Sequence, residues 1–215
     1  MKPFTLSNKT DFLIGLFVLG LITANIIGGK ITTLFGVSIS VAIFMYPLTF
    51  LVTDIIAEVH GKKRSYNLII IGFVTLILLL GLIYLCIYLP PNERYTLNDS
   101  YVSILQTSTR MIIASLVAFL FSQFHDVWAF HLIKEKTHGK WLWLRNNVST
   151  SISQFIDTII FIFIAFYHLA PKFDFAFMWK LIIPYFLFKV AFALIDTPFV
   201  YLGVKWLKKS QDHEV

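Results

Sequence analysis

Continuous apolar runs, each close to 20 residues long, recur along this chain and restrict what it can fold into. A helix of about 20 apolar residues spans the hydrocarbon core of a bilayer. The strands of a membrane barrel would instead alternate apolar and polar residues over about 10 positions. Charged residues make up only 14% of the chain, against about a quarter in a soluble domain. The sequence therefore predicts an all-α integral membrane protein with a single transmembrane domain, residues 1–215.

The apolar runs predict a bundle of six transmembrane helices, over residues 11–29, 37–58, 66–89, 104–132, 148–170 and 178–207. At one end of these spans, the termini and the loops after the second and fourth spans carry 12 Lys and Arg, against 4 at the other end. Because cytoplasmic loops carry the excess of Lys and Arg, both termini are predicted to be cytoplasmic. The net charge of +6 thus reports topology and does not indicate a nucleic-acid partner. The turn-rich residues 89–103 form the predicted outer loop.

Six ionisable side chains lie inside these apolar runs: Asp54, Arg110, Asp126, Asp157, Lys189 and Asp196. Each costs roughly 3 kcal/mol at the centre of a membrane, and such groups usually mark a site or pathway inside a helical bundle. Arg110, in the outer third of its span, is expected to snorkel to the interface.

The second predicted span places Asp54 and Glu58 four residues apart on one helical face. Two stacked carboxylates could bind a donor-rich ligand or carry a proton, although Glu58 could also be an interfacial charge near Lys62. Pro47 lies a turn and a half from Asp54, where it is expected to kink the helix and open a cavity.

Polar side chains also share faces in the later spans. Gln123 and Asp126 lie on one face, with His125 and Trp128 beside them. The fifth span carries a polar stripe at steps of three and four, formed by Asn146, Ser149, Thr150, Ser153, Gln154 and Asp157. A stripe at membrane depth should face a partner helix or a wet cavity. The alternative is a hydrogen-bonded clamp between helices, and for His125 a structural role.

The two Ser-Gln-Phe-X-Asp segments, at residues 122–126 and 153–157, could belong to a pseudo-symmetric central site. In the sixth span Lys189 and Asp196 are seven residues apart on one face, where Lys189 either neutralises an aspartate across the bundle or forms a structural ion pair. Ala114 and Ala118 form a pair of small residues that packs within the chain or between two copies, and a homodimer is expected.

Motifs of catalysis are missing from the sequence. It has no His-Glu-x-x-His, Gly-x-Ser-x-Gly or Walker A pattern. One cysteine, Cys86, excludes a disulfide framework and a cysteine metal site. We therefore expect no enzyme, no cofactor and no metal.

Several segments together resemble the queuosine precursor transporter family, also called the vitamin uptake transporter family. These are Tyr46 to Asp54, Ser122-Gln123 with Asp126-Val127, and Leu142 to Asn147 running through to Asp157-Thr158. Thr23 to Ile26 with Lys30, and Phe188-Lys189-Val190 with Asp196-Thr197-Pro198, fit the same pattern.

This resemblance implies uptake of a 7-deazaguanine across the bacterial inner (plasma) membrane without an ATPase, for queuosine modification of tRNA. Candidate substrates are 7-cyano-7-deazaguanine, 7-aminomethyl-7-deazaguanine and queuine. A carboxylate, Asp126 or Asp157, would accept the N1 and exocyclic N–H groups, and an amide, Gln123 or Gln154, would donate to O6.

Aromatic side chains near the polar positions, such as Phe50 and Trp128, could stack on the flat ring. Asn25, Asp54 and Lys189 would complete or balance the pocket. All these groups are expected to converge on one wet chamber.

The candidates for coupling or gating are Pro47, Glu58, His125 and Asp196; proton coupling and facilitated entry followed by trapping in tRNA fit equally well. Two other functions are compatible with the residues. The chain could be the substrate-binding subunit of an energy-coupling-factor-type vitamin importer. It could also be an intramembrane enzyme with Asp54 and Asp157 as an acid–base pair.

Overall fold

The computed structural model describes residues 5–136 and 142–209. Within these ranges it does not describe the side chains of residues 62, 123, 124, 126, 127, 129–131, 133, 134, 142–150, 193, 194, 196 and 197.

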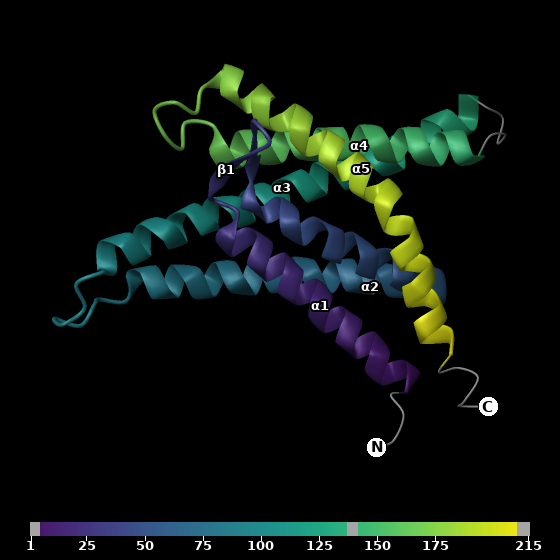
Figure 1. Cartoon of the computed structure of the whole chain (residues 1–215), viewed down its shortest axis with the longest axis horizontal. Helices are drawn as coiled ribbons and strands as arrows, with labels where there is room; N and C mark the ends of the chain where they lie inside the picture. Colours follow the sequence, from purple (N-terminus) through teal and green to yellow (C-terminus); the bar gives the residue numbers. More distant parts are fainter. Residues whose placement is uncertain (1–4, 137–141, 210–215) are drawn as a thin grey trace. The chain divides into compact units, whose positions relative to one another are not determined.

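The described chain is almost entirely helical (Figure 1). Its elements are α1 (Leu6–Ile27), β1 (Ile31–Leu34), β2 (Val37–Ser40), the 3-10 helix η1 (Val41–Met45), α2 (Tyr46–Tyr88), α3 (Asn98–Lys136), α4 (Leu142–Phe166) and α5 (Phe175–Lys208). Among the described residues, five segments are long and apolar enough to cross a membrane: Leu6–Ile27, Val41–Gly61, Lys63–Tyr88, Asn98–Ser122 and Phe175–Phe192. In α4 the side chains are described over Ser151–Phe166, and this segment is apolar but shorter. The predicted all-α, multi-pass membrane protein is thus confirmed, as five to six apolar helical segments.

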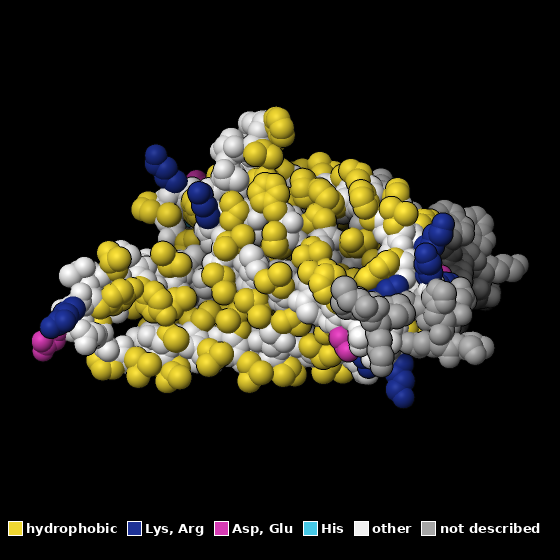
Figure 2. All heavy atoms as spheres, turned by 60° about the horizontal axis from the view of Figure 1, so that its bottom comes forward, with side chains coloured by type: hydrophobic (Ala, Val, Ile, Leu, Met, Phe, Trp, Pro, Cys, Tyr) yellow, Lys and Arg dark blue, Asp and Glu magenta, His cyan; other side chains and the backbone are white. Residues whose placement is uncertain are grey.

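The surface supports the same assignment. Large apolar side chains are exposed along the helices, among them Leu78, Leu82, Phe121 and Leu187, each about 60% exposed. Figure 2 shows hydrophobic side chains spread over much of the visible face outside the part drawn in grey. Soluble monomers seldom expose contiguous apolar patches of this kind, whereas lipid covers them in a membrane protein.

The chain divides into two compact units. The first unit contains Met1–Thr32, Ser40–Thr109 and Phe188–Val215, and the second contains Thr33–Ile39 and Arg110–Leu187. The boundaries fall inside α3 and α5, so both helices contribute to both units.

A single break reverses the chain within α2. Gly61 has φ 75° and ψ 179°, a left-handed conformation that glycine adopts without a Cβ clash. Figure 1 shows α2 turning back at this point, and Leu68, beyond the break, packs in the same core as Val52 and Ile56, before it. The predicted loop between the second and third spans was therefore wrong, because a one-residue break replaces it and Lys63 and Arg64 are already helical.

The core of the first unit joins α1, both halves of α2 and the end of α5. Its buried members are Leu13, Phe17, Val52, Ile55, Ile56, Leu68 and Leu207. Gly203 on α5 lies so close to α2 that a Cβ there would be 2.2 Å from Cδ1 of Ile55. Close helix contact at this position thus requires the absence of a side chain.

A short β-hairpin replaces the predicted start of the second span at residue 37. Phe35 and Gly36 both have positive φ, 51° and 79°, as in the two-residue turns whose twist suits a hairpin. The β-branched residues Ile31, Val37 and Ile39 favour the flanking strands. Ser40 then caps η1: its Oγ accepts from the Ala42 amide at 3.2 Å and donates to the Gly28 carbonyl at 2.6 Å.

The remaining boundaries differ modestly from the prediction. The outer loop is shorter than 89–103, because α3 begins at Asn98. Helix α4 begins at Leu142 and ends at Phe166, and α5 continues through Pro184 and Pro198. Ala114 and Ala118 are both buried within the chain, so this pair of small residues packs internally.

Candidate functional site

Lys189 on α5 is a buried cation of the first unit. Only 5% of its surface is exposed, and its Nζ lies 5.1 Å from the centroid of the Tyr46 ring. Tyr46 in turn contacts Phe50 with ring centroids 5.8 Å apart. A cation over an aromatic face is stabilised by about 2 kcal/mol when desolvated. Two predicted site residues, Lys189 and Phe50, thus both contact Tyr46. Sequence reasoning did not select Tyr46.

Asn25 on α1 is also buried, with 4% of its surface exposed. Its Nδ2 donates to the Leu21 carbonyl of its own helix at 2.9 Å. Buried polar groups need hydrogen-bond partners, and the Leu21 carbonyl supplies one for Asn25.

Pro47 does not kink a helix, contrary to the prediction. It lies in the first turn of α2, where the missing N–H has no partner to lose and the fixed φ suits helix initiation. The departure from helical geometry in α2 is at Gly61 instead.

The two carboxylates of α2, Asp54 and Glu58, are both exposed. Thr53 beside them is bonded back to its own helix, with its Oγ 2.8 Å from the Phe50 carbonyl and 3.1 Å from that of Thr49. Carboxylates of a membrane helix need a wet cavity or a partner. Asp54 and Glu58 therefore keep their place as candidate site residues.

The second unit holds a polar contact between α3 and α4. His125 Nδ1 lies 3.0 Å from Oγ of Ser153, within hydrogen-bond distance, and Ser153 is only 4% exposed. The His125 ring also packs on Trp128, with centroids 5.8 Å apart. The predicted polar stripe of α4 thus faces a partner helix at Ser153. His125 was predicted to take part in coupling or gating, with a structural role as the alternative. Its contact with Ser153 between two helices is of the structural kind.

Gln154 and Asp157 are half-buried on α4, next to this contact. Thr158, fully buried, donates to the Gln154 carbonyl at 2.8 Å. Ile152, one residue before Ser153, is exposed. Phe155 packs edge-on against Phe186, with ring centroids 5.0 Å apart.

Four predicted site residues lie outside the described side chains: Gln123, Asp126, Asn146 and Asp196. The other candidates fall into two sets, one in each unit. Asn25, Pro47, Phe50, Asp54, Glu58 and Lys189 belong to the first unit, and His125, Trp128, Gln154 and Asp157 belong to the second. The shared chamber stays a prediction.

Arg110, which was expected to snorkel to the interface, has hydrogen-bond partners at the end of another helix. Its Nε donates to the Ile164 carbonyl at 2.6 Å, and Nη2 donates to the Tyr167 carbonyl. Both carbonyls lie at the C-terminal end of α4, where the last C=O groups have no partner within the helix and the helix dipole attracts a cation. Arg110 therefore caps α4 from α3.

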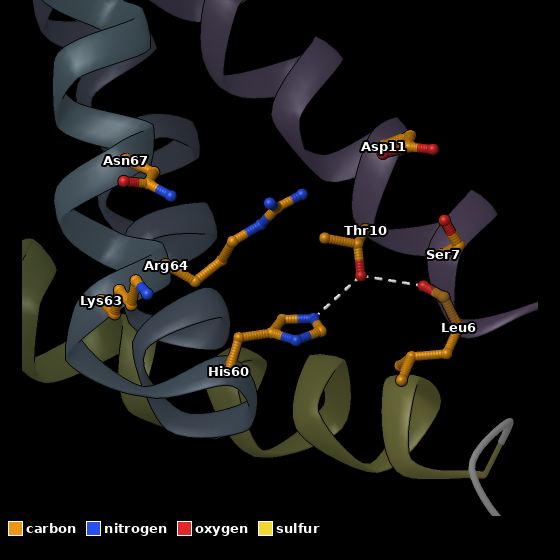
Figure 3. A pocket seen from close by; sticks show the side chains of 8 residues that line it. All are labelled: Leu6, Ser7, Thr10, Asp11, His60, Lys63, Arg64 and Asn67. Atoms are coloured by element: carbon orange, nitrogen blue, oxygen red, sulfur yellow. Dashed lines mark hydrogen bonds between the residues drawn. The ribbon is translucent and has the colours of Figure 1, made fainter.

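A cavity of about 530 Å³ lies between the start of α1 and the part of α2 around the break, within the first unit. It is lined by Leu6, Ser7, Thr10, Asp11, His60, Lys63, Arg64 and Asn67 (Figure 3). Sequence reasoning missed it, because the basic cluster at residues 62–64 was interpreted only as a topology signal.

Comparison with known proteins gives two matches. The family model described as "Putative vitamin uptake transporter" matches residues 40–203. The curated "Probable queuosine precursor transporter" of Bacillus subtilis (strain 168) is 32% identical over 202 residues, which cover 92% of this chain and 86% of that protein. No solved structure matches significantly. The apolar helices, the embedded polar residues and these two matches lead to one conclusion: the chain belongs to the vitamin uptake transporter family.

Proposed function

We propose that this protein imports queuosine precursors, 7-deazaguanines such as 7-cyano-7-deazaguanine, 7-aminomethyl-7-deazaguanine or queuine, across the bacterial inner membrane. The observation that carries the proposal is the 32% identity, over 92% of the chain, with a relative that is named a queuosine precursor transporter. Buried polar groups inside apolar helices support it, since a carrier of a flat polar heterocycle needs such groups at membrane depth. No catalytic step is assigned.

The proposed topology has six spans with both termini in the cytoplasm. The two halves of α2 count as two spans, because the break at Gly61 reverses the chain. Helix α4, 25 residues long, has the length of a further span. The excess of Lys and Arg at the termini then lies on the cytoplasmic side.

The guanine-type edge suits the polar groups of α4. Ring N1–H and the exocyclic amine are donors, and a carboxylate such as that of Asp157 accepts from both. The O6 atom is an acceptor, and the amide of Gln154 can donate to it. Half-burial of Asp157 and Gln154 keeps these groups accessible to a ligand. Gln123 and Asp126 on α3 offer the same pair of groups in the sequence.

Flat-ring recognition also requires aromatic faces. Trp128 is 61% exposed, and Phe50 is half-buried beside Tyr46. Base–aromatic stacking contributes about 1–3 kcal/mol per base in known systems. We assign Trp128 and Phe50 as stacking candidates, and Asn25, Asp54 and Lys189 as the groups that complete the polar environment.

Uptake is tested in a bacterial strain that can neither synthesise nor import queuosine precursors. The strain expresses this chain and receives each deazaguanine in the medium, and queuosine in tRNA is measured by retardation on a boronate gel. We expect modified tRNA at external concentrations at which the empty strain shows none. Absence of modified tRNA for all three compounds, with the protein present in the membrane, would refute the proposal.

A matched pair of variants on α5 tests the site. Lys189→Met removes the buried ammonium beside Tyr46, whereas Lys180→Met removes an exposed lysine of the same helix. We expect Lys189→Met to lower uptake at least about tenfold, which corresponds to about 1.4 kcal/mol, and Lys180→Met to leave it unchanged. Equal uptake by the two variants, at equal membrane abundance, would remove Lys189 from the site.

Ligand-induced thermal stabilisation of the purified chain distinguishes a transporter that acts alone from the substrate-binding subunit of a larger importer. Stabilisation by a deazaguanine without uptake in the strain would indicate that the chain binds the substrate but needs an energising partner.

A further inference from the structure

The cavity beside the break in α2 has the composition of an anion site. Of its eight lining residues, Lys63 and Arg64 are basic and Asp11 is acidic. Ser7 and Asn67 add a hydroxyl and an amide that can donate hydrogen bonds. The lining therefore has a net positive charge and an excess of donors.

Arg64 is placed to meet a ligand there. Figure 3 shows its side chain extending from α2 into the space between the two helices, with Thr10 and Asn67 on either side. Both Arg64 and Lys63 are exposed, and no ion pair of either is found among the described side chains. A guanidinium presents a planar fork of N–H groups that fits two oxygens of one phosphate.

The buried lysine of α1, Lys9, has a different role. Lys9 is 7% exposed; its Nζ donates to the Trp206 carbonyl at 2.5 Å and lies 4.6 Å from the centroid of the Trp206 ring. Lys9 thereby attaches α1 to α5 and does not line the cavity.

Hydrogen bonds through Thr10 connect α1 to α2 beside the cavity. Thr10, 3% exposed, has its Oγ 2.8 Å from the Leu6 carbonyl and 2.9 Å from Nε2 of His60. A hydroxyl has one proton, so when Oγ donates to the carbonyl it must accept from His60, which then carries its proton on Nε2. The helices on either side of the cavity are thus held in register without using Lys63 or Arg64.

We propose that this cavity binds a phosphate group, as the headgroup of an anionic phospholipid or as a soluble phosphate. The volume of about 530 Å³ falls within the range of small-ligand sites and leaves room beyond the phosphate itself. Basic pockets between transmembrane helices are a common means of binding anionic headgroups. This site is separate from the proposed substrate residues, and it stands whether or not the chain transports a deazaguanine.

Thermal unfolding of the purified chain in a phosphate-free, uncharged detergent tests the proposal. Phosphatidylglycerol, phosphatidylcholine and inorganic phosphate are titrated separately. Phosphatidylglycerol or inorganic phosphate should raise the melting temperature, and phosphatidylcholine should raise it least. Stabilisation by the lipid alone identifies a headgroup site, and stabilisation by inorganic phosphate identifies a site for soluble phosphate.

Variants that change the charge of the lining in opposite directions make the test specific. Arg64→Gln should raise the half-saturating concentration at least about tenfold, because it removes a charge-assisted contact. Arg64→Lys, which keeps the charge but loses the fork, should have a smaller effect. Asp11→Asn should lower the half-saturating concentration, because it removes the one anion of the lining.

Lys205→Gln is the matched control, since Lys205 is an exposed cation of the first unit outside the cavity. Its response to ligand should equal that of the unaltered chain. The proposal would be overturned if neither ligand stabilised the chain, or if Arg64→Gln and Lys205→Gln responded alike.

Discussion

Replacement of Arg110 by methionine should destabilise the protein, because Arg110 caps the end of α4. The change removes two hydrogen bonds from a charged group to the carbonyls of Ile164 and Tyr167. Hydrogen bonds to charged groups contribute about 1.5–3 kcal/mol each. The expected loss is therefore at least about 3 kcal/mol, or about 6–12 °C in melting temperature for a chain of this size.

The lysine variant separates capping from snorkelling. A snorkelling arginine could be replaced by lysine at little cost, since both side chains reach the interface. Lysine has one ammonium in place of a planar fork. As a cap it would make fewer of the two hydrogen bonds to the carbonyls. We therefore expect Arg110→Lys to destabilise the protein about half as much as Arg110→Met.

Unfolding is followed in detergent by the fluorescence of the five tryptophans. Arg94→Met is the control, because Arg94 is an exposed arginine in the segment between α2 and α3, and its melting temperature should match that of the unaltered chain. If Arg110→Met melted within about 2 °C of Arg94→Met, the capping argument would be wrong.

Glycine positions provide two further predictions. Gly61→Ala should destabilise the protein by about 1 kcal/mol or more, because alanine is strained at φ 75°. Its control is Gly81→Ala, in an open helical position, which should be neutral or stabilising in the same unfolding assay. Gly203→Ala should lower the melting temperature, because its Cβ would lie 2.2 Å from Cδ1 of Ile55. The double variant Gly203→Ala/Ile55→Val, which lacks that Cδ1, should recover part of the loss, and additive effects of the two substitutions would contradict the predicted clash.

The spans of the bundle were predictable because hydropathy over 20 residues is a strong signal. The hairpin at residues 31–40 was not, because a short apolar segment rich in β-branched residues does not differ in hydropathy from a helix. Its turn, Phe35-Gly36, also lacks the Asn-Gly or Asp-Gly signal of a two-residue hairpin. The reversal between the second and third spans was predicted, but its form as a one-residue break at Gly61 was not. The basic residues that follow Gly61 are equally typical of a loop.

The identity of the site residues stays a prediction, and the contacts of these residues were not predictable from the sequence. Lys189 was selected because ionisable groups inside apolar runs are rare, and Asn25 because its segment resembles the family. Both are buried. Their partners depend on how helices face each other, which residue spacing within one helix does not determine. Tyr46 beside Lys189 was missed for this reason. So was the pairing of Arg110 with a carbonyl 54 residues along the chain.

The break at Gly61 restricts how the two halves of α2 can move. One non-helical residue supplies only two soft dihedral angles, so the arms on either side can splay like a hinge but cannot slide lengthwise past one another. An altered angle at this joint would swing His60 and Arg64 on opposite sides of it, and with them the mouth of the cavity. Any conformational cycle that recruits α2 is therefore expected to proceed by tilting and not by translation.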